Sequence, residues 1–218
     1  MRLTVNLFIT LDGVIQGPGG AEEDPDNGFD RGGWLVPHTG EGQLAPVDGW
    51  FRTADAVLLG RNTFEMMRSY WPQVTDPDNI VATVLNGWPK YVVSNTLSDD
   101  EAAWGDTTVL RGDVLEHVRR LKETGRGELQ VHGSWQLVRS LHDAGLVDTY
   151  RLLQFPVVIG DGKRLFPDGA IPATYKISEI VALDGGSGAI SIELNQVGFD
   201  SMDAGTFVVR DGKEAVSA

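Results

Sequence analysis

The sequence predicts an α/β fold in which one mixed sheet organises a single domain. Residues 56–59 form a short apolar run that suits a buried strand, and a helical pattern follows directly after Gly60. A longer apolar run at residues 148–159 is typical of a central strand. Two further runs, at residues 175–183 and 189–197, flank a Gly-Gly-Ser-Gly segment, which predicts an antiparallel hairpin.

The other elements follow from local patterns. Asp113 stands where a helix N-cap belongs, and Leu137, Val138 and Leu141 share one face of a helix that starts after Gly133-Ser134. The predicted strands span residues 3–10, 56–59, 90–96, 107–110, 129–132, 148–159, 175–183, 189–197 and 206–210. The predicted helices span residues 44–53, 61–71, 114–124 and 134–146, and residues 80–87 are ambiguous between a loop and a short helix.

Two segments have no regular pattern. Residues 18–42 are rich in Gly, Pro and acidic side chains, which is typical of a functional lid or a mobile loop. Their acidic residues fit no calcium-loop spacing, so a solvated loop is the favoured interpretation. The chain shows no linker, so we predict one domain over residues 1–210 and a frayed polar tail over residues 211–218.

Composition excludes several classes of function. The 218 residues are 41% hydrophobic, which suits one sizeable core. Cysteine is absent, so disulfides, thiol nucleophiles and cysteine-based zinc sites are excluded. The histidines have no metal-ligand spacing. The net charge of -13 opposes binding to nucleic acid and to anionic membranes, and without a signal or membrane span we expect a cytoplasmic protein.

Three predicted strand ends carry small or hydrogen-bonding residues. They are Gly60-Arg61-Asn62-Thr63, Ser94-Asn95-Thr96 and Gly133-Ser134, and the first and third lead into helices. Free N–H groups at a helix start bind anions, and Arg61 adds a cation suited to phosphate. Because ligands bind at the carboxyl ends of strands in open α/β sheets, the pattern favours a nucleotide. The alternative is that these residues only ease turns, and no G-x-G-x-x-G is present.

These motifs resemble a known family. Gly60-Arg61-Asn62-Thr63 is similar to the cofactor-binding turn of the dihydrofolate reductase fold, and residues 129–135 are similar to its later glycine turn. Residues 141–166 and Leu11-Asp12-Gly13 resemble the reductase half of the bifunctional riboflavin-biosynthesis deaminase/reductase. The resemblance covers about residues 2–210. It implies a three-layer fold, with helices on both faces of a mostly parallel sheet and a C-terminal antiparallel hairpin.

The resemblance implies NADPH as hydride donor and assigns roles by position. Arg61 would hold the adenosine 2′-phosphate and Thr63 the pyrophosphate. An arginine suits NADP better than NAD, whose free ribose is matched by an acidic residue. The other residues expected at the cofactor are Thr10, Ile15, Gln16, Gly17, Gly60, Asn62, Ser94, Asn95, Thr96, Arg111, Gly133, Ser134, Trp135, Gln136 and Asp161.

The proton donor and the substrate contacts are less determined. In dihydrofolate reductases a carboxylate on the first helix faces the substrate, and Asp48 has a similar spacing, with Asp12 as the rival. Either residue can instead cap or solvate a turn. The aromatic residues Trp34, Trp50 and Phe51 are candidates for stacking on a planar substrate, although such residues more often belong to a core.

The sequence therefore predicts an NADPH-dependent reductase of a small heterocyclic or sugar-derived acceptor, resembling the uracil reductase of riboflavin biosynthesis. Three alternatives remain: dihydrofolate reduction, reduction of an unrelated metabolite, and a non-catalytic NADP-binding module in which the loop at residues 18–42 fills the substrate pocket. A homodimer is compatible with the apolar run at residues 152–159. His132 lies at the end of a predicted strand, so it is either a core imidazole, which is the favoured interpretation, or a residue that approaches the ligand.

Overall fold

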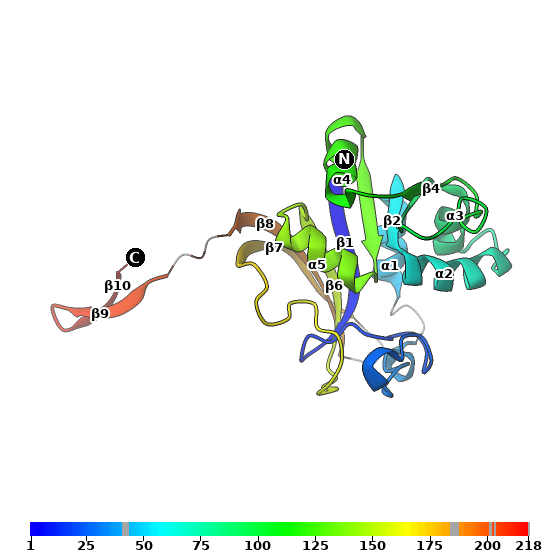
Figure 1. The fold of residues 1–218 in the computed structure, drawn as a ribbon. Helices are drawn as coiled ribbons and strands as arrows, with labels where there is room; N and C mark the ends of the chain where they lie inside the picture. Colours follow the sequence, from blue (N-terminus) through cyan, green and yellow to red (C-terminus); the bar gives the residue numbers. More distant parts are fainter. Residues whose placement is uncertain (41–43, 184–187, 201, 203, 218) are drawn as a thin grey trace.

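An eight-stranded sheet forms the centre of the molecule in the computed structural model, which describes residues 1–40, 44–183, 188–200, 202 and 204–217 (Figure 1). Its strand order is β4-β3-β2-β5-β1-β6-β8-β7. The strands are β1 (Arg2–Thr10), β2 (Ala56–Gly60), β3 (Lys90–Val93), β4 (Thr107–Leu110), β5 (Glu128–His132), β6 (Thr149–Phe155), β7 (Ala173–Ala182) and β8 (Ile190–Phe199). Neighbours from β4 to β6 run parallel, and β8 pairs antiparallel with both β6 and β7, so the mixed sheet is confirmed.

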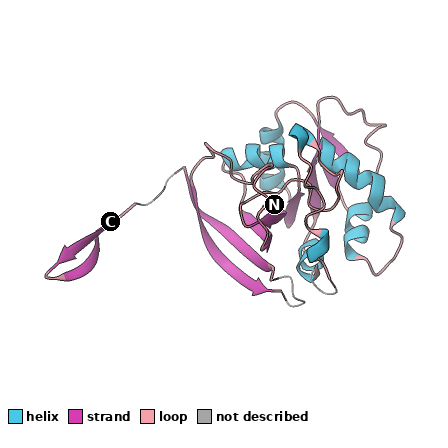
Figure 2. Cartoon of the chain, turned by 90° about the horizontal axis from the view of Figure 1, so that it is seen from below, coloured by secondary structure: helices cyan, strands magenta, loops and turns pink. Residues whose placement is uncertain are grey.

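Helices cover both faces of this sheet (Figure 2). They are α1 (Ala45–Arg52), α2 (Arg61–Tyr70), α3 (Ile80–Gly87), α4 (Val114–Thr124) and α5 (Trp135–Asp143). On one face, Val118 of α4 and Leu141 of α5 pack against Leu3, Val5 and Leu129 of the sheet. The first three helices cover the other face, where they share a second apolar cluster with β2 and β3. Among the described residues, no helix is long and apolar enough to cross a bilayer.

Several predicted boundaries need correction. The strand predicted at residues 90–96 ends at Val93, because Ser94 turns the chain by accepting the N–H groups of two following residues. The strand predicted at residues 148–159 ends at Phe155, since Pro156 cannot donate to a ladder. The ambiguous segment at residues 80–87 is helix α3, capped by the side chain of Asn79.

The C-terminal part forms two hairpins. The turn that was predicted between β7 and β8 at residues 185–188 lies, apart from Gly188, outside the described residues. Beyond β8, strands β9 (Thr206–Arg210) and β10 (Lys213–Ser217) pair antiparallel and stand apart from the main sheet (Figures 1 and 2). The frayed tail predicted after Arg210 is therefore wrong, because Asp211 and Gly212 take positive φ values and turn the chain back.

One stripe of the sheet is polar although it is buried. Side chains at alternate positions of β1, β5 and β6 face the same side, so that Asn6 lies in register with His132 on one strand and with Arg151 on the other. The members of this polar stripe are Thr4, Asn6, Glu128, Gln130, His132, Thr149 and Arg151, all less than a tenth exposed. Helix α1 covers the stripe, since Trp50 and Thr53 at its end bond to Gln130 and Glu128.

Candidate active site

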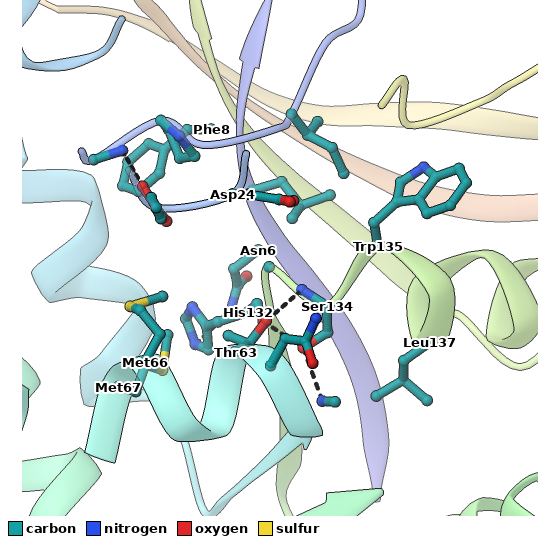
Figure 3. A pocket seen from close by; sticks show the side chains of 18 of the residues that line it. Asn6, Phe8, Asp24, Thr63, Met66, Met67, His132, Ser134, Trp135 and Leu137 are labelled. Carbon is teal, nitrogen blue, oxygen red and sulfur yellow. Dashed lines mark hydrogen bonds between the residues drawn. The ribbon is translucent and has the colours of Figure 1, made fainter. Parts of the chain in front are cut away.

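A cleft of about 1200 Å³ opens where β1, β2, β3 and β5 end. Its walls are the loop after β1, helices α1 and α2, and the start of α5 (Figure 3). Fifteen of the predicted site residues line it: Ile15, Gln16, Gly17, Asp48, Trp50, Phe51, Gly60, Arg61, Asn62, Thr63, Ser94, Gly133, Ser134, Trp135 and Gln136. Residues from distant parts of the chain thus meet at the sheet edge where the predicted strand ends were expected to converge.

The turns after β2 and β5 bind each other directly. The Gly60 N–H donates to Ser134 Oγ over 2.9 Å, and the Ser134 N–H donates to Thr63 Oγ1 over 3.0 Å. Ser134 Oγ in turn donates to the carbonyl of His132. Gly133 has a φ of +54°, and a Cβ there would lie 3.3 Å from the Thr63 side chain, so this close approach requires glycine.

The N-termini of α2 and α5 therefore lie together at the cleft, and neither is closed by a side-chain cap. Gly60 has no side chain to cap α2, and the Ser134 hydroxyl is used by Gly60 and His132 rather than by its own helix. N–H groups of the first turns thus stay available to an anion. Arg61 lies beside them, with Nε donating to Glu65 over 2.8 Å and a terminal nitrogen donating to Thr96. The donors suit a phosphate group.

The residues predicted at the adenosine end are mostly engaged within the protein. Ser94 Oγ accepts from the Thr96 and Leu97 N–H groups, and Asn95 Oδ1 accepts from Gly112. Arg111 binds the Leu97 carbonyl and Asp99. Asn95, Thr96 and Arg111 do not line the cleft. Thr96 reaches its edge through Arg61.

The long loop after β1, at residues 18–42, is held by hydrogen bonds and ion pairs from Gln16 and Lys163. Gln16 donates to the carbonyls of Asp24 and Asp26 and accepts from the Lys163 N–H. Lys163 Nζ forms ion pairs with Asp24 and Asp26 at 2.7 and 2.8 Å, and these pairs raise its pKa although burial opposes them. Loop residues line one wall of the cleft, and its 1200 Å³ remains between them and α2. Asp161 instead lines a neighbouring cavity of about 450 Å³.

The two candidate carboxylates differ in their surroundings. Asp48 lies on α1, is exposed and lines the cleft, and its carboxylate has no hydrogen-bond or ion-pair partner among the described residues. Asp12 does not line the cleft, and it accepts from Thr10 Oγ1, from the Gly160 N–H at 2.7 Å and from the Ile159 N–H at 3.2 Å. Burial would raise the pKa of Asp12, but these hydrogen bonds outweigh it and lower the pKa.

Of the three predicted aromatic residues, two line the cleft and one does not. Trp34 lies in an apolar cluster, edge-on to Phe155, and its indole N–H donates to the Gln16 carbonyl rather than reaching the cleft. Trp50 belongs to that cluster but lines the cleft as well. Phe51 also lines the cleft and stacks on His132, with ring centroids 4.3 Å apart.

The structure adds Asn6, which the sequence did not indicate as a site residue, and His132, for which a core position was favoured over an approach to the ligand. Both lie at the base of the cleft beside Met66 and Met67 of α2 (Figure 3). Burial, followed by the charge of Arg151, lowers the pKa of His132 to about 3, so the imidazole is neutral at physiological pH. The signal that could have identified them is the alternation of polar with apolar residues in both strands.

Comparisons with known proteins agree with this geometry. The family model of the RibD C-terminal domain matches residues 2–188. The chain belongs to the RibD C-terminal domain family. The Bacillus subtilis protein YyaP is 30% identical over 173 residues, which are 77% of this chain and 81% of YyaP.

Solved structures show the same fold as this RibD C-terminal domain. The deaminase/5-amino-6-(5-phosphoribosylamino)uracil reductase of Thermotoga maritima has a TM-score of 0.60 and 16% identity over 90% of this chain and 56% of that one. A dihydrofolate reductase from Enterococcus faecalis, complexed with NADP(H), has a TM-score of 0.56 and 15% identity over 89% of this chain and 96% of that one. The predicted dihydrofolate reductase-like fold is thus confirmed.

Proposed function

We propose that this protein is an NADPH-dependent reductase that transfers a hydride to a small heterocyclic or sugar-derived acceptor. The observation that supports this most strongly is the pair of uncapped helix starts, at α2 and α5, joined through Gly60, Thr63 and Ser134 beside Arg61. A dinucleotide pyrophosphate fits such a cradle, and a guanidinium fits a 2′-phosphate. NADPH supplies the hydride when bound.

In this proposal, residues of the chain bind the cofactor phosphates, orient the acceptor and donate a proton to it. The turns after β2 and β5 hold the phosphates, while Phe51 and Trp50 offer a ring surface to the acceptor. Asp48 is the proposed proton donor, directly or through a water, since its carboxylate lines the cleft and has no partner in the described part of the chain, whereas Asp12 binds the backbone of the loop at Gly160. A positioned acid contributes about 10²–10⁴-fold to such a transfer.

The cofactor assignment is tested by titration of the protein with NADPH and NADH while tryptophan emission is followed. We expect quenching with both and tighter binding of NADPH. Arg61→Ala should weaken NADPH about ten- to a hundredfold, the worth of a charged hydrogen bond, and leave NADH nearly unchanged. Arg68→Ala is the matched control, because Arg68 lies on the same helix, bonds to Glu101 and does not line the cleft. Equal affinity for both cofactors would contradict the assignment.

The reaction is tested by following NADPH oxidation with dihydrofolate, with the aminouracil intermediate of riboflavin synthesis, and with a panel of small carbonyl and imine metabolites. Turnover of one acceptor should fall about 10²–10⁴-fold in Asp48→Asn while NADPH affinity is kept. Turnover of dihydrofolate alone would favour dihydrofolate reduction. Bound NADPH that no acceptor oxidises would favour a binding module without catalysis.

A further inference from the structure

The amide of Asn6 is a buried polar group without a satisfied partner. The residue is 3% exposed, it lines the cleft, and its Oδ1 has no hydrogen-bond partner among the described residues. An unsatisfied buried amide costs about 1–3 kcal/mol. Native proteins contain few such groups, so each one requires a physical explanation. Figure 3 shows this amide next to His132, on the open side of the sheet that faces α2.

Hydrogen bonds within the polar stripe prevent His132 from accepting a hydrogen bond from the Asn6 amide. Gln130 Nε2 donates to the Trp50 carbonyl and to Glu128, which fixes the Gln130 amide with Oε1 toward His132. His132 Nε2 lies 3.0 Å from that oxygen and must carry the proton to bond it. The neutral ring has only this one proton.

Asn6 Nδ2 lies 3.4 Å from the same ring nitrogen. Because that nitrogen is itself a donor, the approach gives the Asn6 N–H groups no acceptor. Among the described residues, the Asn6 carbonyl therefore has no donor, and with this His132 tautomer the Asn6 NH₂ gains no acceptor from the ring. Glu128 is in turn held by Arg151 through bonds of 2.7 and 3.1 Å, so the chain that fixes this arrangement is anchored by an ion pair.

Thr4 carries a second buried polar group without a partner among the described residues, and it can be compared with Asn6. It lies two residues before Asn6 on the same face of β1, is fully buried, and its Oγ1 also has no partner within the described part of the chain. Thr4 does not line the cleft, whereas Asn6 does. The two unsatisfied groups share a strand, a face and a degree of burial, and they differ in access to a ligand.

We infer that Asn6 is a specificity-determining residue of the cleft, whose amide pairs with a ligand edge that carries a hydrogen-bond donor and an acceptor side by side. A cyclic amide or amidine in a planar ring has such an edge. The stacked pair of Phe51 and His132 gives the ring a flat neighbour. The inference rests on the proposed function only in taking this ligand to be the hydride acceptor.

The test uses two probes of nearly the same shape. Pyrimidinone carries a ring N–H beside its carbonyl, and methoxypyrimidine keeps the ring but loses that donor. Binding is measured by calorimetry with and without saturating NADPH. The wild-type protein should prefer pyrimidinone about tenfold, the worth of one net hydrogen bond. Asn6→Leu and Asn6→Ser should reduce the preference to about twofold or less, and Thr4→Val should keep it.

Each outcome decides the inference. A preference that survives in both Asn6 variants overturns it, and so does failure of the wild-type protein to bind either probe. A preference that is lost equally in Thr4→Val shows a structural effect and also overturns it. If NADPH does not bind while the pyrimidinone preference depends on Asn6, the inference stands and the proposed function fails. If NADPH binds and the Asn6 variants change nothing, only the inference fails.

Discussion

The two faces of strand β1 are built from opposite chemistry. On one face Leu3, Val5 and Leu7 pack with α4 and α5 and bury only apolar side chains. On the other, Thr4 and Asn6 lie in the polar stripe under α1. The apolar face gains about 25 cal/mol for each Å² removed from water. On the polar face each buried group costs free energy unless it is hydrogen-bonded, and among the described residues Thr4 Oγ1 and Asn6 Oδ1 have no partner.

The apolar face of β1 therefore contributes mainly to stability, whereas the polar face contributes to ligand recognition within the proposed function. A buried ion pair such as Arg151–Glu128 is weak evidence for stability, because desolvation offsets the attraction of its charges. Here the pair anchors a chain of bonds that runs through Gln130 to His132 and ends at the cleft. The apolar face can be changed at the expense of stability alone, whereas changes in the polar stripe should also alter what the cleft binds.

The largest effect is expected where the polar stripe loses its cation. Arg151→Met removes the cation that binds Glu128 and Glu193 and leaves Arg2, 3.9 Å from Glu193, as a more distant one, so we expect a loss of about 3–5 kcal/mol in the free energy of unfolding, measured by urea denaturation. The variant that combines it with Glu128→Gln and Glu193→Gln removes the stranded charges and should regain most of that loss. A single variant that loses less than about 1 kcal/mol would show that the pair is not effectively buried.

On the apolar face, Leu129→Ala removes a fully buried side chain from the cluster under α4 and α5. We expect a loss of about 2–5 kcal/mol, depending on how far the cavity collapses. Affinity of the folded protein for NADPH and the preference for pyrimidinone should both be unchanged in calorimetry. A changed preference would erase the functional distinction between the two faces.

The pH dependence of stability should report His132. The pKa of the imidazole is about 3 in the folded protein and about 6.5 when unfolded, so between these values the unfolded chain binds the additional proton. This contribution to stability is complete well above pH 6.5 and is lost as the pH falls toward 3, by up to about 1.4 kcal/mol per pH unit.

We expect the urea midpoint of the wild-type protein to decrease as the pH is lowered from 7 to 5.5. The midpoint of His132→Gln should decrease less steeply. His117→Gln is the control, since His117 lies on α4 away from the polar stripe and bonds to the Arg111 carbonyl. Parallel pH profiles for the wild-type protein and His132→Gln would mean that His132 is solvated in solution.

The smallest effect is expected at Thr4. Thr4→Val replaces an unsatisfied hydroxyl with a methyl group of nearly the same size, so the free energy of unfolding should stay unchanged or rise by up to about 1 kcal/mol. Urea denaturation beside the wild-type protein measures it. A loss above about 1 kcal/mol would reveal a partner of the hydroxyl group, such as an ordered water. Thr4 would then no longer be an unsatisfied group comparable with Asn6.

Local patterns predicted most of the fold and the meeting of the turns after β2 and β5. Gly60 and Gly133 each mark a strand end directly, and their convergence follows from parallel strands ending at one edge. The sequence could not choose between Asp48 and Asp12, because the partners of Asp12 at Ile159 and Gly160 are distant along the chain. The assignment of individual cofactor contacts stays a prediction, as does the homodimer.

The polar stripe was missed for a related reason. A polar residue in an apolar strand is visible in the sequence, but its role depends on neighbours across the sheet. His132 is understood only once Arg151 is known to lie two strands away. The sequence favoured a core imidazole for His132 over a residue that approaches the ligand, whereas the structure shows that His132 is buried and also lines the cleft.

The bond between Gly60 and Ser134 joins residues 74 positions apart. During synthesis, therefore, the proposed phosphate cradle cannot exist until β5 has emerged and paired beside β2. A nascent chain stopped before that point would contain Arg61 and Thr63 but no second turn to hold them. Within the proposed function, nucleotide binding should therefore begin only after β5 has formed, and it would stabilise the folded domain rather than direct its early folding.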